Sequence, residues 1–450
     1  MGKLFRNLYQ SKKSKSRLGE INTAHGTIKT PAFVPVGTKG TIKALLPSLI
    51  KEIKIQIAFV NTYHLVTHPG AEIIAKAGGI HKFANLSIPL MSDSGGFQVF
   101  SLASSKVKNQ PFDFAQGKSS KIKNNKEKKA KILQDDGRRP ERPMIEKISN
   151  DGVRFRSVFD GELIEFTPER SMEYQKMIGA DINMAFDECT YYPATHKYAE
   201  KAMKRTHEWL TRCIQYKKSK IQNPKSQTNS KSEIKNSKQN SLNLENLKLF
   251  STSNLGFRNY LYGVIQGATF EDLRRQSAEF VVSQNVDGVA IGGVSVGETK
   301  KEMREQVGWV ADYLPKDKPV HLLGVGQIDD IIDLVKQGID TFDCVEPTRL
   351  ARMGIIYQVQ REKYKVQSES SKFKVFSNQV DILKGQYRYN LESIDNNCNC
   401  YVCKNFTKSY LHHLFKQREI LGYNLATYHN LWVMERLMED IRQKIKNDEI

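Results

Sequence analysis

Four clusters of polar and glycine residues each follow a short apolar run, and they contain side chains able to do chemistry. The clusters are Ser92-Asp93-Ser94-Gly95-Gly96-Phe97-Gln98, Phe186-Asp187-Glu188-Cys189-Thr190, Gly263-Val264-Ile265-Gln266-Gly267 and Phe342-Asp343-Cys344-Val345. A single Asp after a strand often only caps the next helix. Three Asp and one Gln at such positions instead favour an active site at the carboxyl ends of parallel strands.

Asp93 and Asp343 form a pair of carboxylates suited to a reaction at a glycosidic carbon. One acts as the nucleophile and the other as general acid and base, around a transition state with oxocarbenium character. A barrel glycoside hydrolase would use the same pair. It would also predict aromatic sugar platforms at the mouth, and it leaves a cysteine cluster and the basic charge of the chain unexplained.

Asp187, Gln266 and the Gly292-Gly293 backbone are suited to reading the edge of a flat heteroaromatic base. An ionised Asp accepts hydrogen bonds from ring N–H and amine groups, and a Gln amide both donates and accepts. Phe97 could stack on such a base or belong to the core. A cysteine nucleophile at Cys189 is the weaker interpretation, because no His lies near it in the sequence.

Two arginines follow Asp343 closely in the sequence. Arg349 and Arg352 are predicted to hold phosphates or base edges at the mouth of the site. The alternative is that they are solvated, as exposed arginines after a strand often are.

Cys398-x-Cys400-x2-Cys403 is the strongest local motif, and it predicts a zinc site that needs one more ligand. His412, His413 and His429 are the imidazoles available downstream. A site of three Cys and one His is coordinatively closed, so we expect one structural Zn²⁺ per chain and no metal role in the reaction.

The elements that must position these groups alternate between short strands and amphipathic stretches of helical length. The candidate strands are 32–36, 57–61, 89–92, 182–186, 260–265, 286–291, 319–323 and 339–344, and the clearest candidate helices are 171–179, 271–284, 300–313 and 329–337. Eight strands in this rhythm predict an α/β fold, a (β/α)8 TIM barrel with a C-terminal zinc-binding subdomain. No Gly-x-Gly-x-x-Gly turn favours an open sheet.

The barrel is expected over 1–364 and the zinc-binding subdomain with C-terminal helices over 375–450. Two stretches, 107–149 and 217–256, are rich in Lys, Asn, Ser and Gln and read as disordered or loosely ordered insertions. The net charge of +20 suits a polyanionic partner such as nucleic acid. Residues 104–149 hold 13 Lys/Arg against 6 Asp/Glu, and 217–249 hold 8 against 2, so most of this charge lies in or beside the insertions.

Several features predict a cytoplasmic protein without a membrane anchor. No apolar run reaches the length of a membrane span, and the N-terminus lacks a signal-peptide core. Arg6 occupies the position at which a myristoylation signal has Ser or Thr. Six cysteines in 450 residues, three of them within 398–403, indicate metal binding in a reducing compartment.

These motifs together resemble the tRNA-guanine transglycosylases of the bacterial type, in the queuine tRNA-ribosyltransferase family. The resemblance runs from about residue 21 to 446 and is interrupted by the two insertions. Its carriers are the four clusters above together with His25-Gly26-x-Ile28-x-Thr30-Pro31, Asn61-Thr62-Tyr63-His64-Leu65, Ile291-Gly292-Gly293-Val294-Ser295-Val296-Gly297-Glu298, Pro347-Thr348-Arg349 and the Cys cluster with His429-Asn430.

The resemblance implies exchange of guanine at anticodon wobble position 34 of tRNA for 7-aminomethyl-7-deazaguanine (preQ1), in queuosine biosynthesis. Asp343 would be the nucleophile that forms a covalent enzyme–RNA intermediate, and Asp93 the general acid/base. Asp187, Gln266 and the Gly293–Val294 backbone would hold the base, and Glu298 would support the peptide beside Val294. Cys398, Cys400, Cys403 and His429 would bind zinc.

The implied partners are tRNAs with a GUN anticodon (for aspartate, asparagine, histidine and tyrosine), preQ1, guanine and a second copy of the chain. Cys189 and Val296 resemble the bacterial subtype, whereas eukaryotic catalytic subunits have Gly at the latter position. A noncatalytic tRNA-binding subunit with the same barrel is the remaining alternative. It is disfavoured because the chain retains Asp93 and Asp343.

Overall fold

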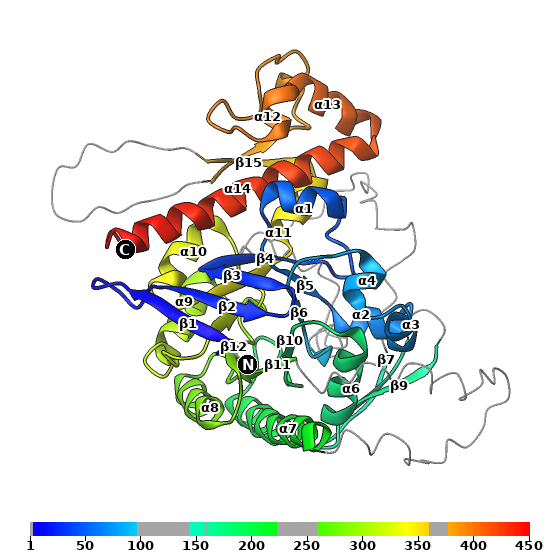
Figure 1. Cartoon of the computed structure of the whole chain (residues 1–450), viewed down its shortest axis with the longest axis vertical. Helices are drawn as coiled ribbons and strands as arrows, with labels where there is room; N and C mark the ends of the chain where they lie inside the picture. Colours follow the sequence, from blue (N-terminus) through cyan, green and yellow to red (C-terminus); the bar gives the residue numbers. More distant parts are fainter. Residues whose placement is uncertain (1–2, 97–143, 158–160, 223–258, 360–376) are drawn as a thin grey trace, which may run out of the picture.

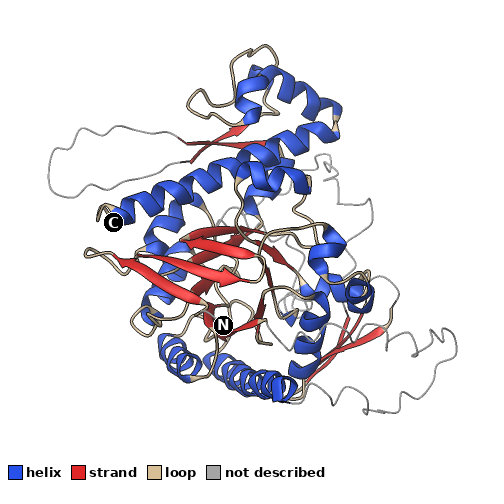
Figure 2. Ribbon diagram, in the orientation of Figure 1, coloured by secondary structure: helices blue, strands red, loops and turns tan. Residues whose placement is uncertain are grey.

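Eight parallel strands form a closed barrel at the centre of the molecule (Figures 1 and 2). The computed structural model describes residues 3–96, 144–157, 161–222, 259–359 and 377–450. The barrel strands are β4 (Ala32–Pro35), β5 (Ala58–Val60), β6 (Leu90–Ser92), β10 (Ile182–Met184), β11 (Tyr260–Ile265), β12 (Gly288–Ile291), β13 (Val320–Leu322) and β14 (Thr341–Cys344). A parallel bridge between Val36 and Phe59 closes the barrel between β4 and β5. The predicted (β/α)8 fold is confirmed, with all eight strands where the sequence placed them.

Helices follow the strands and cover the outside of the barrel, as Figure 2 shows. They are α1 (Pro47–Ile53), α2 (Thr62–Thr67), α3 (Ala71–Lys76), α4 (Ile80–Ala84), α6 (Pro168–Ile178), α7 (His196–Gln222), α8 (Glu271–Ser283), α9 (Lys300–Val310), α10 (Ile328–Val335) and α11 (Glu346–Arg352). Local sequence sets several of their ends. Thr299 and Glu302 form a capping box at the start of α9, and Thr167 caps α6, which ends at the left-handed Gly179.

A three-stranded antiparallel sheet closes the amino-terminal end of the barrel. It consists of β1 (Phe5–Gln10), β2 (Arg17–Thr23) and β3 (Gly26–Thr30). Its residues Phe5, Ile21 and Ile28 belong to the same apolar cluster as the inward-facing residues of the barrel strands. The reactive clusters lie at the carboxyl ends of the strands, so this plug leaves the opposite end of the barrel available for a site.

Two buried polar contacts fasten this lower end. Arg17 pairs with Asp340, which precedes β14, at 2.6 Å. The carboxylate of Asp181 accepts a hydrogen bond from the Leu90 backbone at 2.9 Å and contacts two stacked imidazoles, His25 and His81. Burial alone would raise the pKa of Asp181, but the bonds with His81 and His25 lower it below its ordinary value. Asp181 therefore connects the hairpin turn, α4 and β10 through its charged form.

Regular structure extends into one end of each predicted insertion. Residues 144–148 form β7 (Met144–Ile148), which pairs with β8 (Val153–Arg156), and β9 (Leu163–Phe166) completes a small antiparallel sheet before α6. Residues 217–222 belong to α7. The prediction of disorder is wrong for these residues, because strand pairing and a long amphipathic helix supply contacts that composition does not reveal. Residues 107–143 and 223–256 of the two insertions lie outside the described residues.

The C-terminal subdomain lies on the far side of α14 from the barrel (Figure 1). It contains β15 (Ile355–Val359), β16 (Ser377–Asp381), η4 (Gly385–Tyr387), α12 (Tyr401–Asn405) and α13 (Lys408–Gln417), and α14 (Ile420–Lys446) follows. α14 packs on α11, α1 and β4 of the barrel and also on α12, α13 and β15. The predicted boundary at residue 364 lies outside the described residues. Among the described helices, none has the length and apolar composition needed to cross a membrane.

Candidate active site

The structure brings three of the predicted carboxylates together at the carboxyl ends of the strands. Asp93 directly follows β6, Asp187 lies in the loop after β10, and Asp343 is the penultimate residue of β14. The negative charges of Asp343 and Asp187 both act on Asp93. Acids from three separate strands therefore share one end of the barrel, as an active site requires.

Asp93 is held by donors from the residues after β5. Its Oδ1 accepts the Thr62 N–H at 2.6 Å, and its Oδ2 accepts a short hydrogen bond from the Asn61 amide. Burial nevertheless raises the pKa of Asp93 to about 7, and backbone donors only partly offset this effect. A carboxyl that titrates near neutrality can give up and regain a proton at working pH, which suits a general acid/base.

Asp343 is buried, and its two oxygens have different surroundings. Oδ1 accepts the Gly324 N–H at 2.9 Å and lies 3.1 Å from Nε2 of His321. Within the described residues, no hydrogen bond is recorded for Oδ2. One oxygen of this carboxylate is thus anchored and the other is open to a ligand.

Asp187 and Gln266 form the second part of the site. Oδ2 of Asp187 accepts from Nε2 of Gln266 at 2.7 Å, and Oδ1 accepts from the Ser94 hydroxyl at 2.9 Å. Burial raises the pKa of Asp187 above its ordinary range. Oε1 of Gln266 is buried and has no partner among the described residues. A carboxyl group beside an amide oxygen without a partner offers hydrogen-bond acceptors to the N–H groups on the edge of a heteroaromatic base.

The loop after β12 borders this pair. Gly293 has a φ of +63°, and a Cβ there would overlap Oε1 of Gln266, so the position requires glycine. Glu298 accepts hydrogen bonds from the backbone N–H groups of Ser295 and Val296. The loop therefore holds Val294, which is buried, beside Gln266 in a fixed backbone conformation.

Arg274 of α8 stabilises the same loop, and it was missed from the sequence. Its guanidinium is fully buried and donates to the backbone oxygens of Gly292 at 2.6 Å and Gly293 at 2.7 Å, and to the Gln306 amide at 2.9 Å. Burial lowers the pKa of Arg274 to about 10. The available signal was a basic residue beside Leu273 on the buried face of a helix.

The remaining predicted groups differ in how far the structure describes them. Phe97 lies outside the described residues. Arg349 is exposed on α11, just after β14, and Arg352 donates to the Thr348 carbonyl of the same helix at 3.1 Å. Burial raises the pKa of the Cys189 thiol far above its ordinary value. A thiol that stays protonated is a poor nucleophile, so this environment argues against a cysteine nucleophile at Cys189.

The predicted metal ligands converge in the C-terminal subdomain. The thiols of Cys398, Cys400 and Cys403 lie 3.9, 3.4 and 3.3 Å from Nδ1 of His429 on α14. A tetrahedral zinc ion with ordinary bond lengths separates its sulfur and nitrogen ligands by about 3.6 Å, so the four groups fit a metal ion. Nε2 of His429 lies 2.7 Å from the Tyr357 carbonyl, which fixes Nδ1 towards the thiols.

His412, an alternative ligand by spacing, lies elsewhere. Its Nδ1 is 2.7 Å from the Ile382 carbonyl, and it does not belong to the group of possible metal ligands. The group of possible metal ligands lies in the C-terminal subdomain, away from the carboxylates at the end of the barrel, and this position agrees with a structural role.

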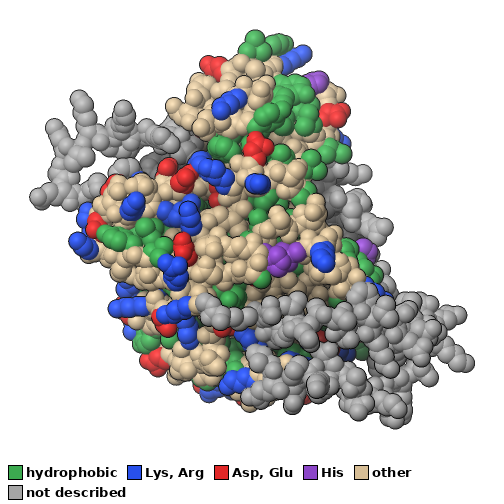
Figure 3. Space-filling model, in the orientation of Figure 1, with side chains coloured by type: hydrophobic (Ala, Val, Ile, Leu, Met, Phe, Trp, Pro, Cys, Tyr) green, Lys and Arg blue, Asp and Glu red, His purple; other side chains and the backbone are tan. Residues whose placement is uncertain are grey.

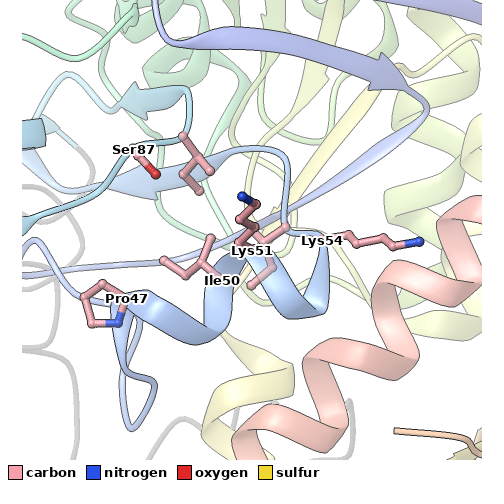
Figure 4. A pocket seen from close by; sticks show the side chains of 7 residues that line it. Pro47, Ile50, Lys51, Lys54 and Ser87 are labelled. Carbon is pink, nitrogen blue, oxygen red and sulfur yellow. The ribbon is translucent and has the colours of Figure 1, made fainter.

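A surface pocket of about 260 Å³ lies between α1 and the residues that precede β5 and β6 (Figure 4). It is lined by Pro47, Ile50, Lys51, Lys54, Ile55, Ser87 and Ile88. Its lining contains no acid, and residues before β5 and β6 lie at the amino-terminal ends of these strands. The pocket is therefore distinct from the carboxylate site.

Carboxylates gathered at this end of a closed (β/α)8 barrel are the arrangement of a barrel enzyme. Comparison with known proteins identifies the family within this class. The family model for queuine tRNA-ribosyltransferase matches residues 12–135 and 118–450. Queuine tRNA-ribosyltransferases of Caldanaerobacter subterraneus subsp. tengcongensis and Aquifex aeolicus are 39% and 38% identical to this chain, covering 97% of it and 92% and 93% of their own lengths.

A third relative, the queuine tRNA-ribosyltransferase of Psychrobacter cryohalolentis, is 38% identical over 97% of this chain and 91% of its own length. The chain belongs to the queuine tRNA-ribosyltransferase family. The resemblance stated from the motifs is thereby confirmed.

Proposed function

We propose that this chain is a tRNA-guanine transglycosylase that replaces guanine at wobble position 34 with preQ1 through a covalent enzyme–RNA intermediate. The observation that carries the proposal is the pairing of two unlike carboxyls at one end of the barrel. Asp93 has a pKa near neutrality, and Asp343 presents one anchored and one open oxygen. Family membership supports the tRNA substrate and the transfer of a base.

In the first half of the reaction, Oδ2 of Asp343 attacks C1′ of the target nucleoside while the bond from C1′ to guanine breaks. Asp93, protonated at the start, gives its proton to the departing base. The ribose is then an ester of Asp343. Asp93 is left as the carboxylate that the second half requires.

In the second half, preQ1 occupies the place of guanine. Asp93 takes the proton from the ring nitrogen that attacks C1′, and the ester bond to Asp343 breaks. Two displacements at the same carbon retain its configuration. Asp187 and Gln266 hold the base, together with the backbone of Gly293 and Val294. Oε1 of Gln266, which has no partner among the described residues, is one acceptor for it.

The tRNA partners follow from the same assignment. Arg349 and Arg352 lie on α11, which follows the strand of Asp343, and we expect them to contact phosphates of the anticodon arm. The expected substrates are tRNAs with a GUN anticodon. A bound zinc ion would hold the C-terminal subdomain together through Cys398, Cys400, Cys403 and His429.

A second copy of the chain is the partner that the surface supports. Tyr389, Leu391 and Ile420 are each 77–79% exposed. Figure 3 shows apolar side chains gathered over the C-terminal subdomain. Large exposed apolar side chains are typical of an interaction surface, and a homodimer would cover them. The cytoplasmic location stays a prediction from the sequence.

The test is incorporation of radiolabelled guanine or preQ1 into tRNA transcripts for aspartate, asparagine, histidine and tyrosine. A matched transcript with adenine at position 34 is the substrate control, and Asp343→Asn is the protein control. Wild type should exchange the base and form an enzyme–RNA adduct that survives denaturation. A wild-type protein that binds tRNA yet neither exchanges the base nor forms the adduct would contradict the proposal.

A further inference from the structure

His321 lies in the middle of β13, and its ring is in contact with Asp343. The side chain is fully buried, in a strand whose other residues are apolar. Nδ1 is 2.8 Å from the Thr341 hydroxyl and Nε2 is 3.1 Å from Oδ1 of Asp343. Phe59 stacks on the ring, with centroids 6.0 Å apart. Both ring nitrogens are therefore used, and the ring plane is fixed.

The register of the barrel explains this contact. His321 is paired with Thr341 across the parallel strands β13 and β14. Residues two apart on a strand face the same side of a sheet, so Thr341 and Asp343 point in one direction. The imidazole thus spans both side chains and links the strand backbone to the carboxylate proposed as the nucleophile.

The chemistry of the three groups determines the direction of the hydrogen bonds. An ionised carboxylate only accepts, so Nε2 carries the hydrogen that faces Asp343. In a neutral imidazole Nδ1 is then an acceptor, and the Thr341 hydroxyl donates to it. In this arrangement both imidazole nitrogens, the Thr341 hydroxyl and Oδ1 of Asp343 have hydrogen-bond partners, and Oδ2 of Asp343 is left without one among the described residues.

We infer that His321 is a positioning residue that makes Oδ2 of Asp343 the attacking oxygen and prepares Oδ1 to become the carbonyl oxygen of the ester. The inference rests on the proposed function of Asp343. Nε2–H of His321 and the Gly324 N–H both donate to Oδ1. Two donors reduce the nucleophilicity of Oδ1 and fix the carboxylate plane, which leaves the lone pairs of Oδ2 facing the ligand.

The same donors act in both halves of the reaction. As Oδ2 forms its bond to C1′, the electron pair of the bond to guanine leaves with that base, and Oδ1 becomes a carbonyl oxygen. When the incoming base attacks C1′ and the ester bond breaks, the electron pair of the C1′–Oδ2 bond returns to the carboxylate and negative charge spreads back to Oδ1. His321 and Gly324 stabilise that charge, so the Asp343 carboxylate leaves more readily.

His321→Phe tests this role, because Phe preserves the ring and the stacking on Phe59 but removes both hydrogen bonds. We expect kcat for base exchange to fall by about ten- to a hundredfold, the range for a lost hydrogen bond to a charged group, while KM for tRNA stays within about twofold. His321→Gln, whose Nε2 reaches a similar position, should restore most of the loss. Thr341→Val should lower kcat less than His321→Phe does.

His412→Phe is the matched control, since it replaces another buried, hydrogen-bonded imidazole far from the carboxylates. Rates of adduct formation and of base attack should both fall in folded His321→Phe and remain unchanged in the control. If His321→Phe does not fold, His321→Gln and Thr341→Val test the inference in its place. The inference would be overturned if Thr341→Val kept wild-type rates and His321→Gln exchanged the base no faster than His321→Leu.

The proposed function is tested separately with Asp343→Ala. An adduct in that variant would overturn the nucleophile and with it the role of His321. An adduct in wild type that is absent from Asp343→Ala, together with wild-type kcat in His321→Phe, would overturn the inference alone.

Discussion

The two halves of base exchange should depend on pH in opposite directions, because both use one proton on Asp93. With a pKa of about 7, the protonated fraction of Asp93 is about 0.9 at pH 6, 0.1 at pH 8 and 0.01 at pH 9. Formation of the enzyme–RNA adduct needs the protonated form. Its single-turnover rate should therefore fall about tenfold from pH 6 to pH 8, and attack by the incoming base should instead slow below pH 7.

Rapid mixing of enzyme with end-labelled tRNA, followed by denaturation at each time point, measures adduct formation. Chasing the adduct with guanine at each pH measures the second half. Asp93→Asn is the control variant: it keeps Asp343, so slow adduct formation should persist without the pH dependence. Binding of tRNA, measured at the same pH values, separates proton transfer from affinity. A wild-type rate of adduct formation that is equal at pH 6 and pH 9 would refute the assignment of Asp93.

The raised pKa of Asp93 also sets the sign of an effect on stability. The folded state holds this proton more tightly than the unfolded chain, so the free energy of unfolding falls as pH rises from about 4 to about 7 and is level above that. The shift from 3.8 to about 7 corresponds to at most on the order of 4 kcal/mol. Asp93→Asn cannot ionise, and its stability relative to wild type should rise over the same interval in chemical denaturation.

Three further predictions concern the metal, the base pocket and the barrel end. Cys400→Ser should lower zinc content and melting temperature together, and a zinc-free variant with unchanged melting would contradict a structural metal. Val296→Gly should admit the bulkier queuine, which wild type should exclude by about a hundredfold in exchange rate relative to preQ1; equal rates for both bases in wild type would sink the bacterial subtype. Burial acts to raise the pKa of Asp181, but the bonds with His81 and His25 lower it, so ionised Asp181 stabilises the fold above about pH 4 and this stabilisation is lost as pH falls. In thermal melts, Asp181→Asn should therefore be less stable than wild type at pH 6, and the difference in stability should become smaller below pH 4. A difference that is constant from pH 3 to 6 would contradict this role.

The barrel could be predicted from sequence because its signal is local. Each barrel strand is a short apolar run that ends at polar or glycine residues, as β6 does before Asp93. The antiparallel sheet β1–β3 was not predicted, and neither was β7. Their strands are half polar, and they are stabilised by pairing with neighbours and by contact with the barrel end, which no window of sequence contains.

Within the site, sequence reasoning pointed to the polar side chains at the strand ends and to Glu298, but it missed Arg274 and His321. Asp93, Asp187, Gln266 and Asp343 stand out because acids and amides interrupt apolar runs. Arg274 and His321 are single polar residues inside a helix and a strand, and each has its meaning only through partners on other elements. The contact of His321 with Asp343 follows from the register of β13 and β14, which is a property of the closed barrel.

Arg274 and His321 act on the site by the same physical means. Each side chain is fully buried and hydrogen-bonded to groups on other elements. Arg274 donates to the backbone oxygens of Gly292 and Gly293, and His321 lies between Thr341 and Asp343. Arg274 fixes the carbonyl groups of the loop that borders Gln266, and His321 fixes one oxygen of Asp343, the proposed nucleophile. Because these donors are already oriented before a ligand arrives, the site would need little rearrangement in the proposed reaction, in which charge moves between Asp343, C1′ and the departing base.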